Sequence, residues 1–228
     1  MNERQKDYRV DYEDLAQQVY RMLKHMILVG EVKTGEKLVQ EDLAERFGVS
    51  RTPLLSAFSK LEKEMLVEFI PRRGAYVRKY ELHEIVDIYE IRVRLEPLGA
   101  AGAAKNADDG SVARLRELCG ELTRMAERHD PGIKEIDYLF HTTIAELSGN
   151  RMLNNIISSF SIIPIANFYG LFKDPKLSAR EHIAITDAIE KRDVRGARRA
   201  MFMHVDVSRR HLIEYIGSAQ RDRVCQQT

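Results

Sequence analysis

The feature that most constrains the fold is a stretch near the N-terminus in which a single glycine separates two short helical patterns. The first pattern covers residues 42–47, places apolar side chains on one face, and stops at Gly48. The second begins behind Ser50, a residue type that favours the N-cap, and has Pro53 in its first turn, where a missing N–H is tolerated. Two helices joined in this way form a helix-turn-helix.

The start of the second helix is where such a motif meets DNA. In a helix-turn-helix the first helix lies across the DNA backbone, and the start of the second enters the major groove. Ser50, Arg51 and Thr52 stand at that start. A guanidinium can donate two hydrogen bonds to guanine, so Arg51 is a predicted base contact. Arg46, at the end of the first helix, is a further predicted DNA contact.

A bracing helix and a hairpin complete the predicted domain. Residues 12–29 have the apolar spacing of a helix that buries one face, and the second helix of the motif is predicted over 52–65. Two β-prone runs follow, at 67–70 and 75–78, around a turn that contains Pro and Gly. A helix-turn-helix with such a hairpin is winged. The wing tip combines two adjacent arginines with a glycine, and it predicts contacts with DNA from Arg72, Arg73 and Gly74.

Length and composition limit the other possibilities. A chain of 228 residues is more often two domains than one, and 44% hydrophobic with 31% charged residues is typical of a soluble protein. No apolar run approaches the ~20 residues that span a bilayer, and no secretion signal is visible, so we expect cytoplasmic residence. The two cysteines form neither a disulfide framework nor a zinc motif. The net charge of +1 means that DNA affinity must come from local placement of charge.

From Leu82 onward the pattern is almost entirely helical. The sequence predicts six helices that form an antiparallel bundle able to hold a small ligand, at 82–105, 111–128, 133–148, 151–170, 178–191 and 194–216. The run from Ser178 to Glu181 reads as a capping box that starts the fifth of them. The predicted fold is therefore mainly α, with a winged helix-turn-helix domain, a helical domain and a polar tail at 8–79, 80–217 and 218–228.

Four side chains in the helical half could bind a metal ion. Asp137 and His141 are spaced i, i+4 on the third predicted helix and project from the same face. His182 lies on the fifth predicted helix and His204 on the sixth. One carboxylate and three imidazoles suit a divalent ion such as Zn²⁺, Ni²⁺ or Mn²⁺, with positions left for a ligand oxygen. Spacing alone leaves the alternative open, because such a pair is more often a surface hydrogen bond and a lone histidine is more often a core residue.

The N-terminal half resembles a known DNA-binding domain. Residues 12–78 are similar to that of the GntR superfamily of bacterial transcription regulators, on the motifs Phe47–Pro53 and Pro71–Val77. The family usually has an arginine that contacts bases where this chain has Leu55, and a glycine where it has Met65. A leucine cannot donate hydrogen bonds to guanine, so the resemblance leaves Arg51 as the main candidate for reading bases.

The C-terminal half resembles the FCD effector domain of the FadR-like branch, and its six predicted helices suggest the VanR-type subgroup. The similarity covers residues 82–216 and rests on the motifs Tyr89–Leu98, Asp137–His141, Ser148–Asn150, Glu181-His182 and His204. Many FCD domains bind a metal through the matching residues and a small organic acid beside it. The resemblance thus implies that the metal ligands are Asp137, His141, His182 and His204.

Two further residues are candidates for contact with the effector. Arg92 shares a helical face with Ile85 and Tyr89 and is expected to point inward, where a guanidinium needs a partner. Glu96 at i+4 would be a structural partner, and an effector carboxylate would be a functional one; the resemblance favours the second. Asn150 is a second candidate, although its place after Gly149 also suits a helix cap.

Together these features predict a ligand-responsive regulator, with repression as the expected mode. It would act as a homodimer on a pseudo-palindromic double-stranded operator, because one recognition helix reads only a few base pairs. A metal-dependent hydrolase joined to a DNA-binding domain is an alternative, since the four-residue centre could activate water. No separate general base stands out to support it. In a third interpretation the helical half only mediates dimerisation and its interior is empty.

Overall fold

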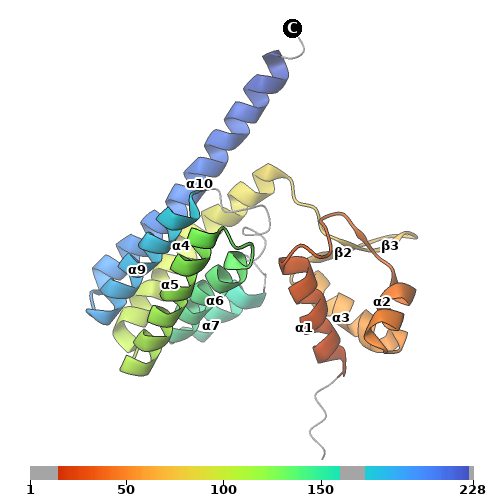
Figure 1. The fold of residues 1–228 in the computed structure, drawn as a ribbon, viewed down its shortest axis with the longest axis horizontal. Coiled ribbons are helices and arrows are strands. Elements are labelled where there is room, and N and C mark those ends of the chain that lie inside the picture. The colour runs from red at the N-terminus through yellow and green to blue at the C-terminus, as the bar shows by residue number, and fades with distance from the viewer. Residues whose placement is uncertain (1–14, 160–172, 226–228) are drawn as a thin grey trace, which may run out of the picture.

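The structure, a computed structural model that describes residues 15–159 and 173–225, has two parts (Figure 1). A small winged helix-turn-helix domain contains α1, α2, α3 and the sheet, and a larger all-helical domain contains the remaining helices. This mainly helical architecture is the one predicted. No helix within the described ranges combines the length and the apolar character needed to cross a membrane.

Three helices and a three-stranded antiparallel sheet make up the N-terminal domain. Their bounds are α1 (Leu15–Leu28), β1 (Lys37–Leu38), α2 (Gln40–Phe47), α3 (Arg51–Lys63), β2 (Val67–Ile70) and β3 (Gly74–Val77). Strand β3 lies between β1 and β2, with Tyr76 opposite both Lys37 and Glu68. The hairpin of β2 and β3 was predicted, whereas β1 was not, because a two-residue strand carries no period of its own.

The turn between α2 and α3 differs in one detail from the predicted one. Gly48 ends α2 in the left-handed conformation, with φ 64°, as a glycine C-cap does. Ser50 occupies the N-cap position of α3, but its side chain makes no capping hydrogen bond. Helix α3 buries Leu54, Phe58 and Leu61 against α1, so the opposite face of α3 remains exposed.

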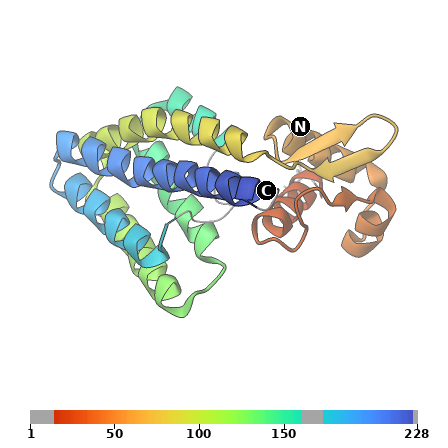
Figure 2. The same cartoon turned by 90° about the horizontal axis from the view of Figure 1, so that it is seen from above.

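Six described helices form the C-terminal domain. They are α4 (Leu82–Asn106), α5 (Asp109–Arg128), α6 (Ile133–Leu147), α7 (Arg151–Ser159), α9 (Pro175–Glu190) and α10 (Val194–Cys225). Helix α10 packs along α4 and α9, as both views show (Figures 1 and 2). Phe140 of α6, Leu118 of α5 and Ile185 of α9 are fully buried inside the bundle. The bundle therefore has a closed core that can hold polar groups away from water.

Two boundaries in this domain correct the sequence prediction. Helix α9 begins at Pro175 instead of 178, and the carboxylate of Asp174 caps it by accepting from the Lys176 amide, so the predicted capping box is wrong. The capping box is instead at the start of α4, where Glu81 and Glu84 satisfy each other's amides. Proline is common at the first position of a helix, and here Pro175 starts α9 three residues before Ser178.

The structure moves the end of one predicted helix and describes only the first part of another. Helix α10 continues to Cys225, through most of the segment assigned to a polar tail, because no glycine or proline follows Gly217 to stop it. Helix α7 starts at Arg151 as predicted, and the rest of the predicted 151–170 helix after Ser159 lies outside the described residues.

Candidate metal centre and DNA-binding surface

Three helices bring the four predicted metal ligands together inside the bundle. Asp137 and His141 come from α6, His182 from α9 and His204 from α10, and all four side chains are buried. One ligand atom from each lies within 4.8 Å of the others. The Nε2 atoms of the three histidines are 3.1, 3.2 and 3.4 Å apart, and Asp137 Oδ1 lies 3.3 Å from His182 Nε2.

The donor set fits a divalent metal ion. Atoms bound about 2.1 Å from one ion stand roughly 3.0–3.4 Å apart at octahedral or tetrahedral angles, which matches the spacing of the Nε2 atoms. Burial lowers the pKa of His182 to about 3 and that of His204 well below its ordinary value, so both rings are neutral. A neutral imidazole has only one N–H, and three ring nitrogens that face one another cannot all be satisfied by mutual hydrogen bonds. A cation would satisfy them together.

Carboxylates contact the far side of two of the three rings. Glu181 Oε2 lies 2.8 Å from His204 Nδ1 and can accept a hydrogen bond from it. Glu96 Oε2 is 2.5 Å from His141 Nδ1, although this close contact lacks the angular geometry of a hydrogen bond. His182 Nδ1 is buried and has no hydrogen-bond partner among the described residues. When Nδ1 of His204 carries the proton and donates to Glu181, its Nε2 presents a lone pair to the centre, as in other carboxylate–histidine–metal arrangements.

Glu96 also binds the buried Arg92. Nε of Arg92 donates to Glu96 Oε1 at 2.5 Å, and the guanidinium lies 5.0 Å from the centre of the Tyr89 ring. Burial alone would raise the pKa of Glu96, but Arg92 and His141 together lower it to about 2, so this carboxylate is ionised. The structural partner considered for Arg92 is therefore present, and one carboxylate joins the guanidinium to a ligand histidine.

Asn150 has a capping role in this structure. Its side-chain oxygen accepts from the Leu153 amide at 3.0 Å, immediately before α7, and the residue is exposed. This is the geometry of an N-cap. The cap alternative thus accounts for the side chain of Asn150.

Sequence reasoning missed the supporting residues of the metal centre. Lys173 is buried and its ammonium contacts Glu181 and donates to the His204 carbonyl at 2.8 Å. Glu181 was assigned to a helix cap, and Glu96 was considered only as a partner of Arg92. The i, i+4 spacing of Arg92 and Glu96 was the one usable signal, because the contacts that reach His141 and His204 join segments far apart in the chain.

The buried histidines predict a pH-dependent stability of the metal-free protein. Between pH 6.5 and about pH 3 the unfolded chain protonates His182 and the folded chain does not, so the free energy of unfolding should fall as pH is lowered. At pH 5 this one residue should lower it by roughly 2 kcal/mol relative to pH 7. Urea unfolding of chelator-treated protein at both pH values measures the change. The variant His182→Leu should lose less stability on acidification; an equal loss would contradict the assignment.

On the other domain, the predicted base-reading residues are exposed at the start of α3. Ser50, Arg51 and Thr52 all face solvent. Arg51 forms an ion pair with Glu41 of α2 at 2.7 Å, and both side chains are more than half exposed. A surface pair of this kind contributes little stability, so Arg51 can exchange Glu41 for a base. Arg46 pairs with Glu31 in the same exposed manner.

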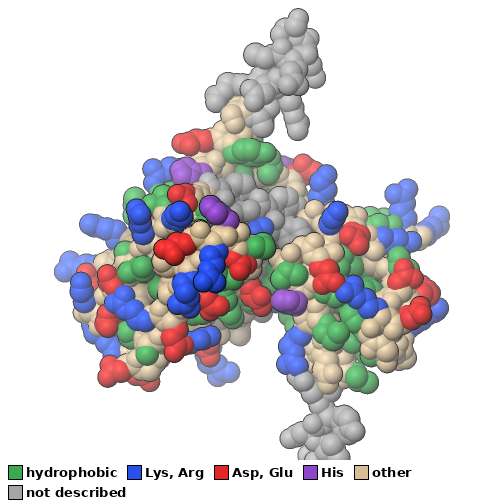
Figure 3. Space-filling view, in the orientation of Figure 1, with side chains coloured by type: hydrophobic (Ala, Val, Ile, Leu, Met, Phe, Trp, Pro, Cys, Tyr) green, Lys and Arg blue, Asp and Glu red, His purple; other side chains and the backbone are tan. Residues whose placement is uncertain are grey.

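The wing brings its two arginines to an exposed tip. Pro71, Arg72 and Arg73 form the turn between β2 and β3, and all three are exposed. Arg72 has φ 64° and Gly74 has φ 102°, so the tip needs left-handed backbone at two positions. On the face of the molecule seen in Figure 3, acidic and basic side chains are interspersed. Any attraction to DNA therefore depends on where single arginines lie.

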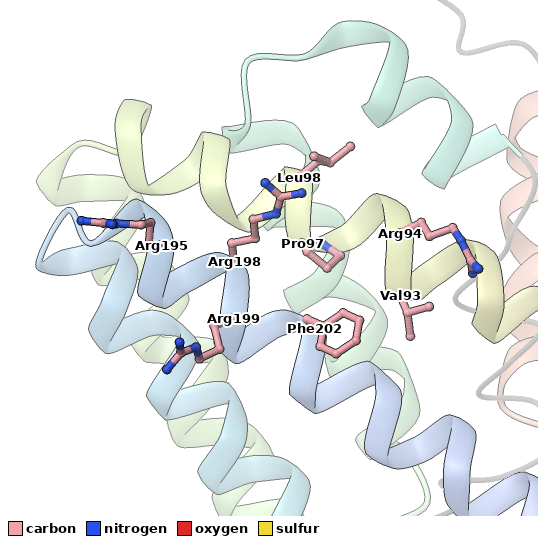
Figure 4. Close-up of a pocket in the computed structure, with 8 residues that line it drawn as sticks. All are labelled: Val93, Arg94, Pro97, Leu98, Arg195, Arg198, Arg199 and Phe202. Atoms are coloured by element: carbon pink, nitrogen blue, oxygen red, sulfur yellow. The ribbon is translucent and has the colours of Figure 1, made fainter.

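A separate hollow lies on the outer surface of the bundle, between α4 and α10 (Figure 4). It encloses about 580 Å³, and Arg198 reaches from α10 toward Leu98 of α4. Its walls come from Val93, Arg94, Pro97, Leu98, Arg195, Arg198, Arg199 and Phe202. None of the four candidate ligands lines this hollow, so it is a different place from the candidate metal centre.

Comparison with known proteins places both domains. Residues 15–77 match the model of bacterial regulatory proteins of the gntR family, and residues 87–207 match that of the FCD domain. The transcriptional repressor RspR of Escherichia coli is 27% identical over 194 residues, which cover 83% of this chain and 85% of RspR. A transcriptional regulator in an unstable DNA locus of Streptomyces ambofaciens is 30% identical over 193 residues, with coverage of 82% and 80%.

A solved structure has the same fold. The E. coli protein McbR/YncC superposes with a TM-score of 0.78 at 23% identity, over 90% of this chain and all of that chain. The two relatives above are transcription regulators and not enzymes. The chain therefore belongs to the GntR family of bacterial DNA-binding transcription regulators and carries an FCD domain as its C-terminal half.

Proposed function

We propose that this regulator is a homodimeric repressor whose helical domain binds one divalent metal ion and a small carboxylate effector. The observation that carries the proposal is the convergence of Asp137 and three histidine Nε2 atoms in a buried centre. Zn²⁺, Ni²⁺ and Mn²⁺ all accept such a donor set. Its operator would be a pseudo-palindromic DNA duplex in the bacterial cytoplasm. The description of the relative RspR as a repressor supports repression as the mode of action.

Two features support an effector site beside the metal. Four protein ligands leave coordination positions open to an oxygen of the effector on an octahedral ion. Arg92 lies one contact away, through Glu96, and its planar guanidinium suits a carboxylate. When bound, the metal would supply a Lewis-acidic contact for the effector. Arg92 would hold the effector carboxylate, and the surrounding buried side chains would exclude water.

Exposed apolar side chains support pairing through the helical domain. Ile91 and Leu98 of α4 are 46% and 44% exposed, and Met152 of α7 is 68% exposed. A surface with several exposed large apolar side chains commonly marks a contact with another protein. Dimerisation on this side would let two recognition helices reach successive half-sites, which increases both affinity and specificity.

A chain of contacts links the metal-bearing helix to the recognition helix. Lys24 of α1 lies 5.8 Å from the ring centre of Tyr138, the neighbour of Asp137 on α6. The same ammonium donates to Glu64 Oε2 at 2.7 Å, and Glu64 caps the C-terminus of α3. Lys24 is largely buried, with 14% of its side chain exposed. A shift of α6 on effector binding would therefore reach α3 through one side chain.

Replacing Lys24 with methionine should weaken this coupling and leave operator binding itself in place. Methionine keeps the apolar stem and removes the charge that contacts both Tyr138 and Glu64. We expect the effect of the effector on operator affinity to decrease by roughly 2- to 30-fold, the range of coupling changes seen along such networks. Fluorescence anisotropy with and without effector measures it. Lys60→Met is the matched control, since Lys60 contacts α1 but not Tyr138; an equal decrease there would contradict the route.

The proposed function itself is tested by operator titration. Operator duplexes are first selected from a random library with the metal-loaded protein, and their affinity is then measured against a panel of small mono-, di- and tricarboxylates. We expect at least one acid to change affinity at least 5-fold, because allosteric couplings are commonly 5- to 150-fold. If every acid that binds the protein leaves operator affinity unchanged, ligand-responsive regulation is wrong. Absence of metal from the purified protein after metal reconstitution would refute the metal site.

A further inference from the structure

One large apolar side chain lies on the exposed face of the recognition helix. Along α3, which is described in full, Arg51, Thr52, Leu55, Ser56 and Ser59 share the face turned away from α1. Leu55 is 45% exposed, whereas its neighbours Leu54, Ala57 and Phe58 are fully buried. The other side chains on the exposed face are polar. Leu55 is thus an apolar position in a surface that is otherwise suited to hydrogen bonding.

The position of Leu55 relative to Arg51 places it within the surface that meets DNA. The two residues are four apart, so their side chains lie one above the other on the same side of α3. They are separated by about 6 Å along the helix, at 1.5 Å per residue. Because base pairs are spaced about 3.4 Å apart, a helix lying in the major groove would place Leu55 one or two base pairs from the base that Arg51 contacts.

Only one feature of the major groove suits a leucine. Leucine has neither a donor nor an acceptor, and the edges of guanine, cytosine and adenine present polar groups there. Thymine adds a C5-methyl group, which apolar side chains contact. Burial of Leu55 against this methyl group would remove both apolar surfaces from water. A cytosine or guanine at the same place would instead lose hydrogen bonds with water and gain none.

We propose that Leu55 is a specificity-determining residue that reads the methyl group of a thymine, one or two base pairs from the base read by Arg51. The inference rests on the proposed role of the Arg51 end of α3 in reading bases. It predicts that each half-site of the operator contains an A·T pair at this position.

Replacement of thymine by uracil in the operator tests the inference, since it removes only the methyl group. Starting from a selected operator duplex and the full-length, metal-loaded protein, each thymine is replaced by deoxyuridine in turn, and the Kd is measured by anisotropy. We expect one position per half-site to lose about 4-fold in affinity, the factor for one buried methyl group. Leu55→Ala, which keeps only one carbon of the side chain, should reduce the sensitivity to the methyl group at that position and leave the sensitivity at other positions unchanged.

A second variant and a matched control complete the test. Leu55→Arg should shift the preferred base at that position from thymine to guanine in a repeated selection, because arginine pairs with guanine O6 and N7. Leu177→Ala, which removes a leucine of similar exposure from α9, should leave all uracil effects as in the wild type. The inference is overturned if no thymine shows a loss, or if Leu55→Ala retains the full loss. Failure of the wild type to select any duplex would instead overturn base reading by α3, and this inference with it.

Discussion

Replacing His182 with alanine is expected to lower the affinity for divalent metal by at least ~100-fold. His182 is fully buried, its Nε2 lies within 3.4 Å of the Nε2 atoms of both other histidines, and it is 3.3 Å from Asp137. Loss of a supporting residue around a metal commonly costs 10- to 100-fold, so loss of a ligand should cost at least the upper end of that range. Elemental analysis after dialysis, together with competition against a chelating dye, measures the change.

A matched histidine separates ligand loss from a general effect of the substitution. His83 is exposed on the first turn of α4 and lies outside the four-residue group. The variant His83→Ala should retain the metal content of the wild type. Metal should also raise the melting temperature of the wild type and of His83→Ala, and leave that of His182→Ala unchanged. If His182→Ala retains metal with wild-type affinity, the proposed metal site is wrong.

Replacing Arg51 with alanine should weaken operator binding by 1–3 kcal/mol, roughly 5- to 150-fold, and flatten base preference at one position per half-site. The reason is that Arg51 is exposed at the start of α3, where a guanidinium can make two hydrogen bonds to guanine. Anisotropy measures the affinity. Binding to a library with each operator position varied identifies where the preference is lost.

Arg73 at the wing tip should behave differently. It is exposed beside the left-handed Arg72, in a place suited to phosphate contact. Arg73→Ala should weaken binding to all sequences and reduce the slope of log K against log salt by about 1. If both variants lost the same base preference and the same salt dependence, the division into a base reader and a phosphate contact would be incorrect.

Local patterns accounted for most of the helices and for the winged motif. The helical spacing of apolar residues on either side of Gly48 and the turn from Pro71 to Gly74 both depend on residues close in sequence. The helix-turn-helix and the hairpin that they predict are present in the structure. Met65 is a position where the family resemblance indicated the backbone conformation although the residue type differs. It adopts φ 61° immediately after α3, a conformation that glycine adopts without strain, and it stands where the resemblance leads one to expect glycine.

Features that depend on distant segments were not predictable. Strand β1 exists because β3 provides a partner almost forty residues later, and its own two residues give no signal. The contact of Lys173 with His204 likewise joins parts of the chain that only the folded bundle brings together. The four ligand positions were identified through the family resemblance, while spacing alone left the choice open between a metal site and ordinary core histidines.

The double contact of Glu96 has a consequence for ligand exchange. Its two oxygens contact different groups, Oε1 the guanidinium of Arg92 and Oε2 the imidazole of His141. An effector that engages Arg92 would compete for that guanidinium, and the freed negative charge would make His141 a stronger electron donor. Effector occupancy should therefore raise the affinity for the metal, and bound metal should raise the affinity for the effector by the same factor. A cell depleted of the metal would then sense the acid less well, even with the DNA-binding half intact.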